Sequence, residues 1–143
     1  MNEVNAMLSF GNTVLYNYLA THIYKSPLDI RTGFLHATNN RMESLNLDIA
    51  EIFKPLIVDR VVFSLINLRC INLTHFYTTP NGEVYLNETG KRIFLRAFYE
   101  KLNTVVTVKD DRKSYRRIIK NEISQLSLHF KNDEKYKGFR QVR

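Results

Sequence analysis

The chain has 143 residues, of which 44% are hydrophobic and 12% aromatic, and its formal net charge at pH 7 is +7. This length and composition are sufficient for one domain with a substantial core, and the positive charge favours a polyanionic partner. A membrane span is not expected, because the longest apolar stretch, residues 56–71, contains Asp59, Arg60 and Arg69. The first charged residue is Glu3, so the basic start of a secretory signal peptide is missing and we expect a cytoplasmic protein.

The positive charge is concentrated near the C-terminus. Residues 109–143 contain 11 Lys and Arg against 5 Asp and Glu, which is a net charge of +6 out of the total of +7. We therefore expect contacts with phosphate groups of a polyanion in this last quarter of the chain.

Two long helices are predicted in the first half of the chain. Apolar residues recur every three to four positions in residues 2–24, which predicts an amphipathic helix, and a long polar connection follows it. Ser44 is the predicted N-cap of a second helix that continues to about Leu73 and is kinked at Pro55. This helix is predicted to be central and buried, with Cys70 as a small core residue. Its apolar residues after the kink are Leu56, Ile57, Val61, Val62, Phe63, Leu65, Ile66 and Leu68.

The second half of the chain is predicted to contain one hairpin and two helices. The turn residues 80–82, Pro-Asn-Gly, stand between aromatic and β-branched residues and predict a β-hairpin over residues 76–86. Asn87 is the predicted cap of a helix that ends at Leu102, and Asp110 or Asp111 begins a last helix to about residue 130. The predicted fold class is therefore mainly α, an irregular helical bundle with at most one small β-hairpin, in a single domain of residues 1–143.

Three residues in the first half could form a metal site. Asp48 and Glu51 are three residues apart, which places both carboxylates on one face of the second helix, and His36 lies in the connection before it. One imidazole with two carboxylates suits Mn²⁺ or Mg²⁺ and does not suit zinc. The alternative is an ordinary solvated helix face beside a polar loop histidine.

Several motifs resemble one known family. They are residues 5–11 (Asn-Ala-Met-Leu-Ser-Phe-Gly), residues 33–36 (Gly-Phe-Leu-His) and residues 44–55 (Ser-Leu-Asn-Leu-Asp-Ile-Ala-Glu-Ile-Phe-Lys-Pro). In this order and spacing they resemble the CRISPR-associated spacer-integration endonuclease, which is the integrase subunit of the CRISPR adaptation complex. The likeness continues through residues 88–92 and the tail 136–140, so it covers essentially the whole chain.

The resemblance implies the helical C-terminal catalytic domain of a metal-dependent DNA endonuclease and integrase that acts in CRISPR spacer acquisition. By position in the motifs it implies His36 and Glu51 as catalytic metal ligands for Mn²⁺ or Mg²⁺. Asp48 is implied as a secondary ligand or a residue that orients one. The family's N-terminal β-rich domain and an upstream helix with a further Glu ligand have no counterpart in this sequence, so we expect the chain to bind metal weakly.

The resemblance also implies partners. They are double-stranded DNA, as protospacer and CRISPR repeat, a small ferredoxin-like subunit of the adaptation complex, and a second copy of the integrase in a homodimer. The candidate DNA-contacting residues are Arg41, Lys54, Arg60, Arg112, Lys113, Arg116, Arg117, Lys120 and Arg140. For most of them a solvated surface or an ion pair is the alternative. A DNA-binding module without catalysis and a subunit-interaction domain are the alternative functions.

Overall fold

The computed structural model describes residues 2–24 and 47–132, and it divides the chain into two compact units. Unit 1 consists of Met1–Leu15 and Phe53–Leu102, and unit 2 consists of Tyr16–Ile52 and Asn103–Arg143. The predicted connection after residue 24, the predicted cap Ser44 and the tail after residue 132 lie outside the described residues.

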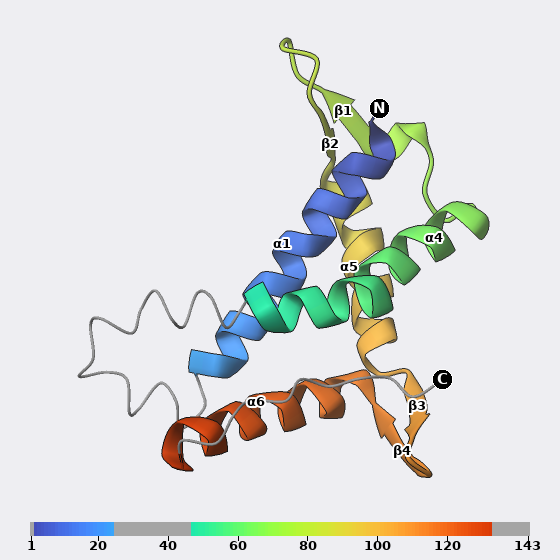
Figure 1. The fold of residues 1–143 in the computed structure, drawn as a ribbon. Coiled ribbons are helices and arrows are strands. Elements are labelled where there is room, and N and C mark those ends of the chain that lie inside the picture. The colour runs from blue at the N-terminus through green and yellow to red at the C-terminus, as the bar shows by residue number, and fades with distance from the viewer. Residues whose placement is uncertain (1, 25–46, 133–143) are drawn as a thin grey trace. The chain divides into compact units, whose positions relative to one another are not determined.

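The first helix, α1 (Glu3–Tyr24), agrees with the prediction from periodicity (Figure 1). It begins directly after Asn2, whose carbonyl oxygen accepts a hydrogen bond from the Ala6 amide at 3.0 Å. No helix in the described part of the chain is long and apolar enough to cross a membrane.

The second helical stretch is interrupted around Pro55, as predicted, but the interruption is a π-helical turn. Residues 47–53 are helical, the π-turn η2 (Lys54–Val58) follows, and α4 (Asp59–Asn67) continues from it. Proline has no amide hydrogen, so an α-helical bond cannot form at that residue, and the wider turn closes instead through the Asp59 amide and the Lys54 carbonyl.

The π-turn keeps one apolar stripe on one face. Phe53, Ile57, Val61 and Leu65 are four residues apart and all buried. In an α-helix, three steps of four residues turn the stripe by about 120° away from its starting direction. The extra residue of the π-turn removes about 100° of this rotation, so the stripe faces the core along its whole length.

The helix ends at Asn67 and not near Leu73 as predicted, because a Schellman motif terminates it. The Arg69 amide donates to the Ile66 carbonyl at 3.1 Å, and the Cys70 amide donates to the Leu65 carbonyl at 3.0 Å. Arg69 has φ 55, the left-handed conformation that glycine usually supplies at this position. The prediction was wrong because apolar periodicity continues past a stop signal that carries no glycine.

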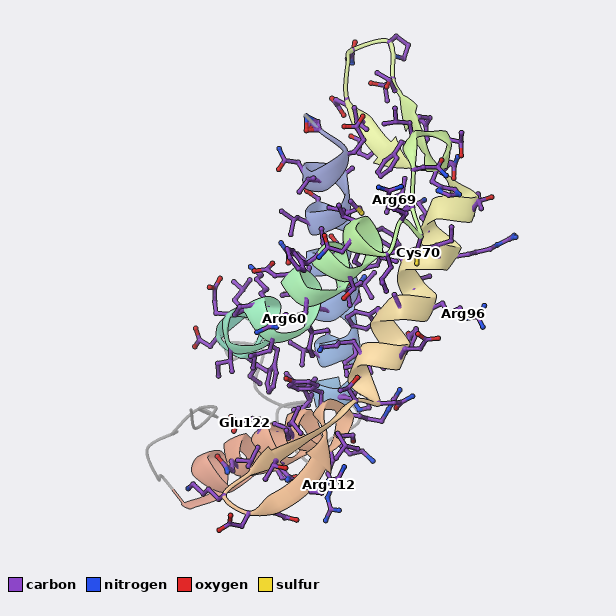
Figure 2. All side chains as sticks on the ribbon, turned by 90° about the vertical axis from the view of Figure 1, so that its right-hand side faces the viewer. Arg60, Arg69, Cys70, Arg96, Arg112 and Glu122 are labelled. Carbon is purple, nitrogen blue, oxygen red and sulfur yellow. The ribbon has the colours of Figure 1, made fainter. Side chains whose placement is uncertain are left out.

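The prediction that this helix is buried was wrong for one of its sides. Phe63 is 65% exposed, Leu68 is 73% exposed and Ile66 is 43% exposed, whereas the residues on the opposite side are buried. Cys70, predicted as a core residue, is exposed as well (Figure 2). An apolar side chain is buried only where a second element covers it, and that information is not contained in the periodicity of one helix.

The first hairpin and the helix after it were predicted correctly. Strands β1 (Phe76–Thr78) and β2 (Val84–Leu86) pair antiparallel, and Gly82 at the turn has φ 88. A short 3-10 turn, η3 (Leu73–His75), precedes β1, and α5 (Glu88–Leu102) follows β2. Asn87 caps α5, because its side-chain oxygen accepts the Gly90 amide at 2.9 Å while its side-chain nitrogen donates to the Thr74 carbonyl at 2.8 Å.

Unit 1 is packed around a close approach of three elements. Phe10 on α1 meets Phe94 on α5 edge to face, with ring centroids 5.4 Å apart. A Cβ atom at Gly11 would lie 2.6 Å from the side chain of Val58 in η2 and 2.7 Å from the ring of Phe94. Only glycine therefore allows α1 to approach η2 and α5 this closely. The buried apolar residues of this unit are Ala6, Met7, Leu15, Phe53, Ile57, Val58, Val61, Val62, Leu65, Ile71, Leu86, Phe94, Phe98 and Leu102.

Unit 2 contains a second hairpin that the sequence analysis did not predict. Strands β3 (Val105–Val108) and β4 (Asp111–Ser114) pair antiparallel, with Val106 opposite Lys113 and Thr107 opposite Arg112. The mainly α fold class is confirmed, but the described residues contain two hairpins and not at most one. The two aspartates taken as the start of the last helix instead lie in and beside the hairpin turn.

The last helix, α6 (Tyr115–Asn132), therefore begins later than predicted. Ser114 is its N-cap, since its hydroxyl oxygen accepts the Arg117 amide at 3.2 Å. The apolar pattern of this helix predicts that Tyr115, Ile118, Ile119, Ile123, Leu126 and Phe130 face inward. The first four are buried, and the side chains of Leu126 and Phe130 lie outside the described part of the chain. Leu19, Ile23, Ile49 and Ala50 are the other buried apolar residues of this unit.

Candidate functional site

The two predicted carboxylates are exposed on one helical segment whose other side is buried. Asp48 and Glu51 both belong to the helical residues 47–53, three positions apart, and both are exposed. The neighbouring Ile49 and Ala50 are buried, so packing fixes which side of this segment faces solvent. The third predicted ligand, His36, lies outside the described residues. Within those residues no group of three or more His, Cys, Asp and Glu side chains is placed to hold a metal ion.

Two predicted DNA contacts lie in unit 1, next to the π-turn. Lys54 is the first residue of η2 and is half-buried, whereas Arg60 is in the first turn of α4 and exposed (Figure 2). Lys101, at the end of α5, has a pKa lowered mainly by its partial burial and further by the positive charge of Arg60. Lys101 could not be recognised from the sequence, because there it looks like an ordinary surface residue of an amphipathic helix. Arg41 and Arg140 lie outside the described residues.

The predicted cluster on the last helix is divided between a strand and a helix. Arg112 and Lys113 lie on β4, not on α6, because the helix begins only at Tyr115. Lys113 is paired with Asp111 at 3.5 Å. Arg112 is exposed and lies on the other face of the hairpin (Figure 2).

Arg116 is held by other parts of unit 2. Its guanidinium donates to the Asn103 side chain at 3.2 Å and to the Tyr18 hydroxyl at 3.4 Å. It also lies 5.8 Å from the centroid of the Tyr18 ring, a cation–π contact. Of the predicted cluster, Arg117 and Lys120 are the exposed members on α6. Arg116 is therefore primarily a packing residue.

Two further charged residues of unit 2 were missed. Lys109 is exposed at the tip of the second hairpin, and Glu122 on α6 is only 3% exposed (Figure 2). The β-branched run of residues 105–108 is the signal that could have revealed the hairpin and with it the position of Lys109. Nothing in the helical pattern distinguishes the buried Glu122, because it stands between a polar and an apolar residue of α6.

Comparison with known proteins identifies the family. The family model described as CRISPR associated protein Cas1 matches residues 1–100. The chain belongs to the Cas1 family. The match contains the segment with Asp48 and Glu51, and it contains η2, the first hairpin and most of α5.

Relatives of this Cas1 chain extend the match toward its C-terminus. The CRISPR-associated endonuclease Cas1 2 of Thermodesulfovibrio yellowstonii is 41% identical over 140 residues, which cover 96% of this chain and 42% of that protein. The CRISPR-associated endonuclease Cas1 of Thermotoga maritima is 43% identical over 130 residues, which cover 90% of this chain and 40% of that protein. The chain thus spans about two fifths of the length of these relatives.

Two solved structures have the same fold. A Cas1 protein from Thermotoga maritima superposes with a TM-score of 0.75 at 42% identity over 90% of this chain and 40% of that chain. A casposase bound to its integration product superposes with a TM-score of 0.77 at 27% identity over 94% of this chain and 37% of that chain. The fold of the Cas1 chain is therefore shared with a protein whose structure contains an integration product.

Proposed function

We propose that this Cas1 chain carries the helical catalytic part of a DNA endonuclease and integrase that acts in CRISPR spacer acquisition. The observation that carries the proposal is the exposed pair Asp48 and Glu51, three positions apart on one helical segment inside the family match. The endonuclease names of the relatives and the integration product bound to the casposase support it. Protospacer and CRISPR-repeat duplexes are the proposed substrates.

The proposed cofactor is Mn²⁺ or Mg²⁺, held by Glu51 and His36 with Asp48 as the secondary ligand. The described donors fit such an ion, because exposed carboxylate oxygens are the ligands that these hard cations prefer. A bound divalent ion would polarise the phosphoryl group of the DNA and stabilise the negative charge that develops on its oxygens. The buried neighbours Ile49 and Ala50 hold the helical segment, so the two carboxylates are presented from a fixed backbone.

The basic surfaces of the chain would hold the DNA. In unit 1, Lys54 is the first residue of η2 and Arg60 lies in the first turn of α4. Arg117 and Lys120 are exposed on α6. Phosphate contacts require mainly charge and reach, which these side chains have. A ferredoxin-like subunit and a second integrase copy are the proposed protein partners.

A DNA-binding module without catalysis is the second candidate function. The observation that favours it is the concentration of charge in residues 109–143, whose net charge of +6 does not depend on a metal site. This alternative predicts duplex binding that weakens steeply with salt and is unchanged by substitution of His36.

The test is Mn²⁺ binding by titration calorimetry. We expect His36→Ala and Glu51→Ala to abolish Mn²⁺ binding. Glu88→Ala is the control and should leave Mn²⁺ binding unchanged, because Glu88 is also an exposed carboxylate on a helix but pairs with Lys91. The titration is repeated on a chain extended by the family's upstream glutamate helix, since the resemblance implies that this helix supplies the remaining ligand. If the extended chain binds no Mn²⁺, or binds it equally after the two substitutions, the metal assignment is wrong. Duplex binding that survives this result would leave the second candidate function.

A further inference from the structure

The second hairpin has two different faces. Along β3, Val105 and Thr107 lie on the same face as Arg112 and Ser114 of β4, because these residues pair across the ladder. Val105 is 47% exposed, and Thr107 and Arg112 are exposed too. The other face contains the half-buried side chains of Val106, Val108 and Lys113. The hairpin therefore packs through one face and exposes the other to solvent. The side chains of the exposed face are small except for that of Arg112.

The turn of this hairpin has an unusual composition. Lys109 and Asp110 are its two central residues, and both have positive φ, 51 and 66. Two-residue turns of this kind strongly prefer Asn and Gly, because a Cβ atom disfavours the left-handed conformation. The chain nevertheless places an exposed lysine at the tip. Non-glycine residues held in this conformation are concentrated at functional positions.

Exposed basic residues continue along the sequence from this hairpin into the helix that follows it. Strand β4 ends at Ser114 and α6 begins at Tyr115, so no loop separates them. The basic residues Lys109, Arg112, Arg117 and Lys120 follow one another from the tip through β4 into α6, and all are exposed. Two acids stand beside these residues: Asp111 pairs with Lys113 at 3.5 Å, and Asp110 is exposed next to Lys109 in the turn.

These dimensions and side chains fit the major groove of a DNA duplex. A two-stranded ribbon enters this groove, which is about 12 Å wide and about 8.5 Å deep, and four-residue strands span roughly 13 Å. Arginine donates two parallel hydrogen bonds to the N7 and O6 atoms of guanine, and the methyl groups of Thr and Val contact the methyl group of thymine. A surface that contacts only DNA phosphates would not need the exposed methyl groups of Thr107 and Val105.

We infer that the β3–β4 hairpin lies in the major groove of the DNA, with Arg112 contacting guanine and with Arg117 and Lys120 contacting backbone phosphates. This inference rests on the proposed function insofar as it requires a duplex DNA partner. It adds a base-reading element to a surface that otherwise recognises only charge. Lys109 at the tip contacts the phosphates of the strand that borders the groove.

The test compares two duplexes that differ in one acceptor atom. One duplex contains guanine and the other contains 7-deazaguanine, which keeps base pairing and phosphates but lacks N7. Binding to the full chain is measured by fluorescence anisotropy over a range of salt concentrations. We expect the chain to bind the 7-deazaguanine duplex about three- to tenfold more weakly, and Arg112→Ala to remove this difference.

Two variants and a control separate base reading from charge. Arg112→Lys keeps the charge but loses the paired donors, so it should retain the salt dependence and lose the discrimination between the duplexes. Lys120→Ala should weaken binding to both duplexes equally and reduce the slope of log affinity against log salt by about one. Arg96→Ala is the control, because Arg96 is 85% exposed but paired with Glu100 in unit 1 (Figure 2).

The outcomes distinguish this inference from the proposed function. If the chain binds both duplexes equally and Arg112→Ala lowers only the salt slope, the hairpin contacts the backbone and the groove assignment is wrong. If Arg112→Ala binds like Arg96→Ala, the hairpin lies outside the DNA interface, while DNA binding itself stands. If the chain binds neither duplex at low salt, the proposed function fails and the groove assignment fails with it.

Discussion

Replacing Gly11 by alanine tests the packing of unit 1 most directly. The added Cβ would lie 2.6 Å from Val58 Cγ1 and 2.7 Å from Phe94 Cζ, and both side chains are completely buried. Valine has a stiff side chain, and the phenylalanine ring is enclosed by the core, so neither can retreat cheaply. Insertion of a methyl group into such a core costs about 1–3 kcal/mol.

The helix propensity of alanine opposes this packing penalty, so the sign of the change in stability shows which of the two is larger. Alanine is favoured over glycine inside a helix by about 1 kcal/mol, so α1 alone would become more stable. Because the methyl group meets two buried side chains at once, we expect the upper end of the packing penalty and a net loss of about 2 kcal/mol. The expected decrease in melting temperature is roughly 4–8 °C.

The measurement is urea unfolding of wild type and Gly11→Ala followed by circular dichroism. Ser9→Ala is the matched control, because Ser9 is exposed on the same helix and its replacement should leave stability within about 0.5 kcal/mol of wild type. The double variant Gly11→Ala with Val58→Ala should be more stable than the sum of the single effects, because it removes one of the two clashes. A Gly11→Ala variant as stable as wild type, or more stable, would refute the close approach of α1 to η2 and α5.

Three other predictions follow from local geometry. Arg69→Gly should stabilise the chain by about 1 kcal/mol, because Arg69 holds the left-handed position of the Schellman motif; an unchanged urea midpoint would contradict this. Asn87→Ala should destabilise it by about 1 kcal/mol through loss of the cap on the Gly90 amide, whereas a midpoint equal to that of wild type would exclude a stabilising cap. The Tyr85 hydroxyl donates to Glu83, and this hydrogen bond and the carboxylate charge raise the pKa of Tyr85. Glu83→Gln should therefore lower this pKa toward its ordinary value in an NMR titration, and a pKa that did not move would locate its cause elsewhere.

The parts of the fold that were predictable from sequence are those with local signals. The first hairpin has Gly82 in its turn and α5 has Asn87 at its start, so turn and cap chemistry identified both. The second hairpin has Lys109 and Asp110 in its turn, and two aspartates before an apolar helix resemble an N-cap. Without glycine or asparagine in the turn, the β-branched residues 105–108 were the remaining sign of a strand.

The candidate site was predictable to a similar degree. A spacing of three residues determines that Asp48 and Glu51 share a helix face, and both side chains are exposed on the helical residues 47–53. The role of Arg116 could not be read from the sequence, because its partners Tyr18 and Asn103 are distant along the chain. The same holds for Phe63, whose exposure depends on which elements lie next to α4.

The π-turn η2 has a consequence for how the chain tolerates changes in length. A π-helical turn contains one residue more than an α-helical turn. The helix therefore has one extra residue near Pro55 that is not needed to keep its apolar residues on one face. Deletion of that residue would return the turn to α-helical spacing while Phe53 and Val61 kept their common direction. A chain that lacks one residue here would therefore retain the same core, and the position marks where this helix can be shortened without turning its apolar face away.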